Sequence, residues 1–154
     1  MLNLQQVNDL IDAALTSIEL RVPKMKLSIG DPEPVRTPGV YGSVIMNALF
    51  TGQVEGKLTF TMEWGTGLQI AEALAGVKIE GFNEVAQQAL ESLFQEMLQL
   101  AANKFAETGT AIDIRLLPTL VDTSVLLAEE GKSGALKIPI VTDSGTISLY
   151  LAFK

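Results

Sequence analysis

Short, mostly neutral polar side chains recur at helical spacing between residues 88 and 103. Amides and hydroxyls can orient a water molecule or hydrogen-bond a partner, and removing them from water costs less than removing a charged group. At about 100° per residue, all of them fall within about 60° of Ser92 on one helix face. This face, which we call the polar stripe, consists of Gln88, Ser92, Gln95, Glu96, Gln99 and Asn103. We predict that it binds a protein partner.

The opposite half of the same helix is apolar and predicts a surface that faces the core. Its residues are Ala86, Leu90, Leu93, Phe94, Met97, Ala101 and Phe105. A simpler interpretation of the polar stripe is that glutamine, a good helix former, covers a solvated surface. Composition alone leaves both interpretations open.

The composition limits the chemistry that the chain can perform. The absence of cysteine and histidine excludes disulfides, thiolate nucleophiles, imidazole bases and the usual zinc ligand sets, so we expect no metal site. A net charge of −7 argues against nucleic-acid binding, which depends on clustered lysine and arginine. The four basic residues near the end of the first helix therefore predict a solvated connection. They are Arg21, Lys24, Lys26 and Arg36.

The length and hydropathy predict one domain over residues 1–154. With 47% hydrophobic residues, a chain of 154 residues is long enough to bury a substantial core. No run approaches the ~18 to 20 apolar residues that a membrane-spanning helix needs. The N-terminal MLNLQQVNDLIDAAL lacks the basic and apolar regions of a signal peptide. We expect a soluble, cytoplasmic protein that does not insert into a membrane.

Apolar residues at helical spacing predict an amphipathic first helix from about residue 4 to about residue 20. Asn3 and Gln6 have the spacing of a capping box at its start, and Pro23 ends it. The proline-rich segment SIGDPEPVRTPG then predicts an extended connection. The helix and the connection precede the first strands.

Two strand-like runs, GSVIMNALF and GKLTFTM, predict a hairpin between residues 41 and 62. The second run alternates polar and apolar residues, which is typical of a half-buried strand. A short helix follows, with Thr66 and Gln69 as its predicted N-terminal cap. It ends at Ala75, where Gly76 suits the C-terminal cap.

From Ile112 onward the sequence is rich in strand-forming residues. The connections EEGK and TDSG contain the glycine that tight turns require, so they predict three or four strands in a meander. The order of elements predicts an α+β fold in which helices pack on an antiparallel β-sheet.

Four segments together resemble a known family. They are VNDLIDAAL in the first helix, Thr51–Gly76, the long helix FNEVAQQALESLFQEMLQLAANKFAETG, and IDIRLLPTLV with its Pro-Thr turn. Their order and spacing resemble those of the CheX and CheC chemotaxis phosphatases over most of the chain. The resemblance implies a CheC/CheX-like fold.

Members of that family remove the phosphoryl group from the aspartate of a phosphorylated CheY-type response regulator, which supplies Mg²⁺. A Glu-x-x-Asn pair projects from one face of their long helix; the amide orients the attacking water and the acid contacts the regulator's conserved lysine. These roles suit phosphoryl transfer, which depends on positioning and charge neutralisation. The resemblance therefore implies such a regulator as partner, Mg²⁺ on the regulator, and no cofactor of this chain's own.

Alignment with the family pattern puts Ser92 at the glutamate position and Gln95 at the asparagine position. The Gln95 amide can hold a water molecule through one donor and one acceptor. Ser92, however, has no charge for a lysine and a shorter reach than glutamate. Glu91 lies about 100° from Ser92, so we expect that it cannot replace the acid without a rotation of the helix.

An alternative register assigns the catalytic positions to Glu96 and Gln99 instead of Ser92 and Gln95. It keeps an acid-x-x-amide pair on the polar stripe, but it requires the loss of about one helical turn before Pro118. Two functions stay open: a phosphatase with an altered active-site pair, and a protein that has lost catalysis and only binds a receiver domain or another signalling partner.

Some CheC members have a second site on the first helix, where this chain has Gln5 and Asn8. Because Gln5 stands where the acid belongs, we make no claim of a second site, and the sequence leaves the question open. The family often forms dimers by pairing sheet edges, and the closing strand TISLYLAFK would be prone to aggregation if its edge were bare. We therefore expect a homodimer.

Overall fold

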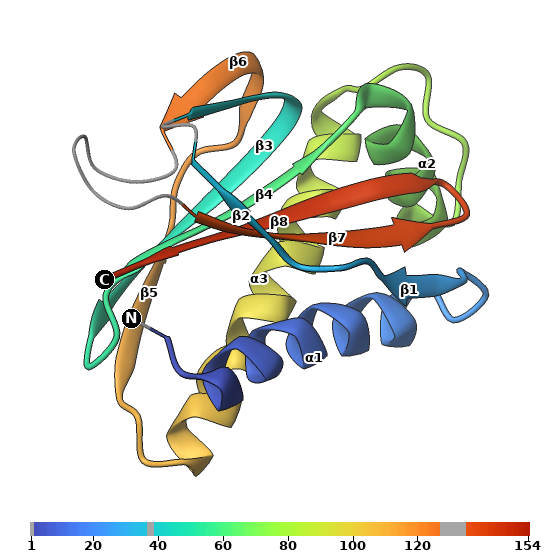
Figure 1. The fold of residues 1–154 in the computed structure, drawn as a ribbon. Helices are drawn as coiled ribbons and strands as arrows, with labels where there is room; N and C mark the ends of the chain where they lie inside the picture. The colour runs from blue at the N-terminus through green and yellow to red at the C-terminus, as the bar shows by residue number, and fades with distance from the viewer. Residues whose placement is uncertain (1, 37–38, 127–134) are drawn as a thin grey trace.

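The structure, a computed structural model, describes residues 2–36, 39–126 and 135–154. Within these residues, three helices pack on an eight-stranded antiparallel sheet, which confirms the predicted α+β architecture (Figure 1). The helices are α1 (Leu4–Arg21), α2 (Trp64–Ala75) and α3 (Glu84–Glu107). The strands are β1 (Leu27–Ile29), β2 (Glu33–Val35), β3 (Gly39–Gly52), β4 (Gly56–Met62), β5 (Ile112–Leu116), β6 (Leu120–Leu126), β7 (Ala135–Thr142) and β8 (Gly145–Phe153).

The predicted ends of the first helix are confirmed. The Asn3 side chain accepts a hydrogen bond from the Gln6 backbone N–H at 2.8 Å, and the Gln6 side chain accepts one from the Asn3 N–H at 3.0 Å. This reciprocal pair satisfies two backbone donors that a helix start leaves free. The extended connection that follows α1 is also present, but parts of it pair with β7 as the short strands β1 and β2.

The predicted start of α2 is wrong, whereas its end is confirmed. The helix begins at Trp64 with Glu63 in the N-cap position, and Thr66 is buried inside its first turn. Thr66 packs closely on the β7–β8 turn, where a Cβ at Gly145 would collide with the Thr66 side chain. The hydroxyl therefore faces a tertiary contact rather than the helix start. At the other end, Gly76 forms the C-cap with a left-handed φ of 72°.

The sheet order is β1-β7-β8-β4-β3-β5, with β2 also paired to β7 and β6 also paired to β3. The predicted meander is therefore wrong except for the β7–β8 hairpin, because β5 and β6 return to a strand of the first half. The predicted EEGK turn lies outside the described residues. Long-range pairing of this kind leaves no local signal in the sequence.

The closing strand β8 lies inside the sheet, between β4 and β7. Its backbone is paired on both sides, so the bare apolar edge from which we argued for a homodimer does not exist. The closing strand therefore gives no reason for a dimer, and a homodimer stays a prediction of the family resemblance alone.

Strand β4 is buried on both faces rather than on one. Thr59 and Thr61, on its predicted solvent face, are buried, and the Thr59 hydroxyl donates to Asn47 Oδ1 at 2.8 Å. A small second cluster around Ala135 and Tyr150 packs away from the main core. The alternating pattern gave the correct strand, but the burial of both faces depends on how the sheet curves around it.

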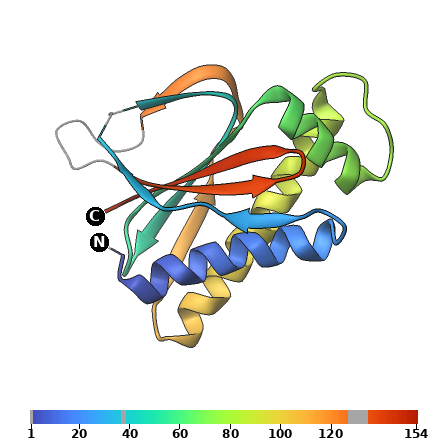
Figure 2. The same cartoon turned by 45° about the vertical axis from the view of Figure 1, so that its right-hand side comes forward.

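Helices α1 and α3 cross on one side of the sheet, and α2 packs near the start of α3 (Figures 1 and 2). All residues predicted for the core face of α3 are buried. Phe94 stacks on Phe60 of β4 with ring centroids 5.2 Å apart, which ties the helix to the sheet. Trp64 packs edge-on against Phe82 at 5.0 Å. None of the helices in the described part of the chain is long and apolar enough to cross a membrane.

Candidate functional site

The polar stripe occupies the surface of α3 that faces away from the core. Its members are exposed except Glu96, which is half-buried. The predicted division of the helix into an apolar and a polar face is therefore confirmed. Since α3 is anchored to the sheet and to α1, the helix presents these side chains from a rigid scaffold.

Glu96 forms an ion pair with Arg21, the last residue of α1, at an Nη1–Oε2 distance of 2.7 Å. The two side chains are 37% and 33% exposed, so solvent screens the pair and its stabilising contribution is about 0.2–1 kcal/mol. Arg21 therefore belongs to α1 rather than to the connection and contacts α3, while its side chain stays partly exposed to solvent. A contact between residues this far apart could not be found from local sequence patterns.

A second carboxylate, that of Glu91, flanks the polar stripe on the other side. Its Oε2 accepts a hydrogen bond from the Thr119 hydroxyl at 2.6 Å, and Thr119 lies between β5 and β6. Glu91 is half-buried. From the sequence, Glu91 was not expected to replace the acid because it lies about 100° from Ser92 around the helix. It lies only about 40° from Gln95, however, which is four residues further along the helix.

The amides of the stripe differ in whether they are already hydrogen-bonded. Gln99 donates to Asn103 at 3.0 Å, and Gln88 donates to Glu84 at 3.2 Å. Among the described residues, the side chains of Ser92 and Gln95 have no hydrogen-bond partner. Their polar groups are therefore available to water or to another molecule.

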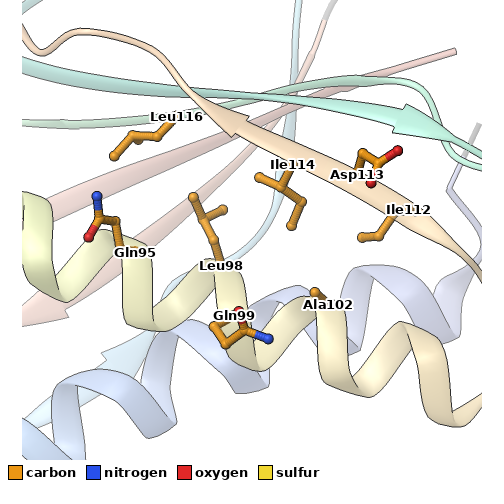
Figure 3. Close-up of a pocket in the computed structure, with 8 residues that line it drawn as sticks. All are labelled: Gln95, Leu98, Gln99, Ala102, Ile112, Asp113, Ile114 and Leu116. Carbon is orange, nitrogen blue, oxygen red and sulfur yellow. The ribbon is translucent and has the colours of Figure 1, made fainter.

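An open groove of about 320 Å³ lies between α3 and β5 (Figure 3). Gln95 stands at one end of it, and Leu98 rises from the helix toward the strand. Five of its eight lining residues are apolar, and the other three are two amides and one carboxylate. It is formed by Gln95, Leu98, Gln99, Ala102, Ile112, Asp113, Ile114 and Leu116. Such a groove can accept an apolar side chain of a partner while its border forms hydrogen bonds.

The corresponding positions on α1 are differently arranged. Gln5 and Asn8 are both exposed, and Gln5 donates to Asp9 Oδ1 at 2.9 Å. Asp9 is 5% exposed and packs within the fold. Among the described residues, no group of three or more acidic side chains could hold a metal ion.

No family profile and no curated protein matches this sequence. Solved structures match over nearly the whole chain. A CheC-like superfamily protein from Shewanella sp. PV-4 is 20% identical, with a TM-score of 0.86 over 99% of each chain. The chemotaxis protein CheX from Desulfovibrio desulfuricans is 14% identical, with a TM-score of 0.86 over 98% of this chain and 100% of that chain.

A chain of the CheX–CheY–BeF₃–Mg²⁺ complex from Borrelia burgdorferi is 18% identical, with a TM-score of 0.74 over 96% of this chain and 97% of that chain. The fold is therefore that of an α+β protein of the CheC/CheX type. The resemblance in sequence to the CheX and CheC proteins is confirmed at the level of the fold.

Proposed function

We propose that this protein is a CheX/CheC-like signalling protein that acts on a phosphorylated CheY-type response regulator. The polar stripe binds the regulator, and Gln95 assists the hydrolysis of its aspartyl phosphate. The observation that carries the proposal is the Gln95 side chain, an exposed amide without a partner among the described residues, at the end of a groove on a CheC/CheX-like fold. A fold alone would leave the function open.

The hydrogen bonds of the stripe favour Ser92 and Gln95 over the alternative register. Glu96 is paired with Arg21, and Gln99 donates to Asn103, so both groups of the alternative pair already have partners. A regulator that used them would have to break these contacts first. Gln95 has no such hydrogen bond to break. Assigning it to the amide position also requires no loss of a helical turn before Pro118.

The chemistry suits an amide. Phosphoryl transfer needs an attacking water held in line and neutralisation of the developing charge. The Gln95 carbonyl can accept a hydrogen bond from that water, and its NH₂ group can donate to a phosphoryl oxygen. Mg²⁺ would come with the regulator, as the family resemblance implies.

Binding without catalysis is the second candidate, and Ser92 favours it. A serine at this position has no charge with which to contact a lysine of the regulator. In that case the stripe and the groove would still recognise the activated receiver domain, and the rate of dephosphorylation would not change.

Binding can be measured by calorimetry with a CheY-type receiver domain loaded with Mg²⁺ and BeF₃⁻, which mimic the phosphorylated state. We expect tighter binding to the activated than to the unactivated domain. Ser92→Arg, in the centre of the stripe, is expected to weaken binding about tenfold or more because it adds bulk and charge to the interface. Ala106→Arg adds the same charge at an exposed position about 21 Å further along the helix axis and serves as control.

Equal affinities for the two arginine variants would contradict a regulator-binding surface at Ser92. Equal affinity for the activated and unactivated domains would contradict recognition of the phosphorylated state.

A further inference from the structure

We propose that Glu91 carries the negative charge that Ser92 lacks, and that it pairs with a cationic side chain of the regulator next to Gln95. Thr119 acts as its positioning residue. This inference rests on the proposed function and names a residue of the site that the family pattern does not contain.

The geometry places Glu91 and Gln95 on the same side of α3. Residues four apart lie about 40° from each other around the helix and about 6 Å apart along it, so their side chains are neighbours. Both are on the side that faces β5 and the segment after it, because Gln95 borders the groove and Glu91 contacts Thr119. An acid and an amide therefore stand together at this end of the groove.

The carboxylate of Glu96, within the stripe, and that of Glu91, beside it, differ in their charge balance. The charge of Glu96 is compensated by Arg21 at 2.7 Å. Glu91 receives a hydrogen bond from a neutral hydroxyl, and no lysine or arginine of the described residues forms a salt bridge with it. A carboxylate has about four acceptor sites, of which Thr119 occupies one. Glu91 thus keeps a net negative charge and free acceptors for an incoming cation.

Thr119 holds this carboxylate in a defined place. It follows Pro118 in the short connection between β5 and β6, and that connection is fixed to β3 by a bond from the Leu117 N–H to the Asn47 carbonyl at 2.9 Å. A side chain that is already ordered loses less conformational entropy when it binds. The hydrogen bond from Thr119 therefore lowers the entropy that the Glu91 side chain loses when it pairs with a cation of the regulator.

The test is a double-mutant cycle on the binding of the same Mg²⁺- and BeF₃⁻-loaded receiver domain. Glu91→Gln removes the charge and keeps the shape, and we expect it to weaken binding about 5- to 10-fold. Glu107→Gln, at the exposed C-terminal end of α3, outside the polar stripe and about 24 Å from Glu91 along the helix axis, is the matched control and should change affinity less than about twofold. When the conserved lysine of the receiver domain is replaced by methionine, Glu91→Gln should have no further effect.

The positioning role of Thr119 is tested with one variant that removes its hydroxyl and one that keeps it. Thr119→Val should weaken binding by about threefold, and Thr119→Ser should recover it. In the Glu91→Gln background, Thr119→Val should have a smaller effect, since there is no longer a charged group to position. A structural role of Thr119 alone would give the same loss in both backgrounds.

Two outcomes separate this inference from the function on which it rests. If the wild-type protein binds the activated domain and Glu91→Gln binds equally well, or Glu107→Gln causes an equal or larger loss, the role of Glu91 is overturned and the proposed function stands. If the wild-type protein does not bind the activated domain, both are overturned.

Discussion

Replacement of Gln95 by alanine is expected to reduce the protein-assisted hydrolysis of a regulator's aspartyl phosphate by about 10- to 100-fold. The amide is the group of the proposed pair to which the family resemblance assigns the attacking water, and alanine offers neither donor nor acceptor. Because Gln95 is exposed and has no hydrogen-bond partner among the described residues, its removal should leave the fold intact. The measurement is the decay rate of the phosphorylated regulator at saturating protein.

Gln99→Ala is the control that distinguishes the two registers. It removes the same amide one turn later, where the side chain is already bonded to Asn103. We expect less than about a twofold change in rate, since the bond to Asn103 already holds this side chain along the helix. A large loss with Gln99→Ala and none with Gln95→Ala would instead assign the site to Glu96 and Gln99.

Phe94→Ala is expected to lower the free energy of unfolding by about 3–5 kcal/mol. Phe94 is 1% exposed, and its ring packs on Phe60 in the contact that joins α3 to the sheet. Alanine would leave a cavity at this contact, and the surrounding side chains could fill it only in part. Urea denaturation measures the loss as a lower midpoint.

Two further variants keep this prediction testable if Phe94→Ala does not fold. Phe94→Leu retains most of the apolar volume and should cost about 1–2 kcal/mol. Val85→Ala shortens an apolar side chain on the same helix that is 53% exposed, and it should change stability by less than about 0.5 kcal/mol. Similar losses for Phe94→Ala and Val85→Ala would contradict the assignment of Phe94 to the core.

The parts of the fold that could be predicted are those with local causes. The capping box at Asn3, the glycine C-cap at Gly76 and the two faces of α3 each depend on residues within a few turns of one another. Helical periodicity alone therefore gave both the core face and the polar stripe. The start of α2 was wrong because Thr66 makes a tertiary contact that its neighbours in sequence do not indicate.

The order of the strands could not be predicted for a similar reason. The return of β5 and β6 to β3, and the insertion of β8 between β4 and β7, join segments that are distant in the chain. Turn residues identify hairpins, but they say nothing about which edge a later strand will join. The expected bare edge of β8 followed from this error.

The candidate site also combines features with local causes and features that depend on residues distant in the chain. The residues of the stripe were found from spacing, but the partners that distinguish them come from other elements. Arg21 reaches Glu96 from α1, and Thr119 reaches Glu91 from beyond β5. Because these contacts cannot be found from the sequence, it left two registers open and gave no role to Glu91. In the structure, Arg21 balances the charge of Glu96, whereas Glu91 is bonded only to a neutral hydroxyl.

The most direct test of the account is the decay of a phosphorylated CheY-type receiver domain in Mg²⁺, alone and with increasing amounts of the protein. If the protein is a phosphatase, the decay rate rises with protein concentration and saturates. Ser92→Glu, which introduces the acid found in the CheX and CheC phosphatases, raises this rate further. An acceleration seen only with Ser92→Glu would point to the binding function instead. A rate that stays at the unassisted value with both proteins would contradict the account.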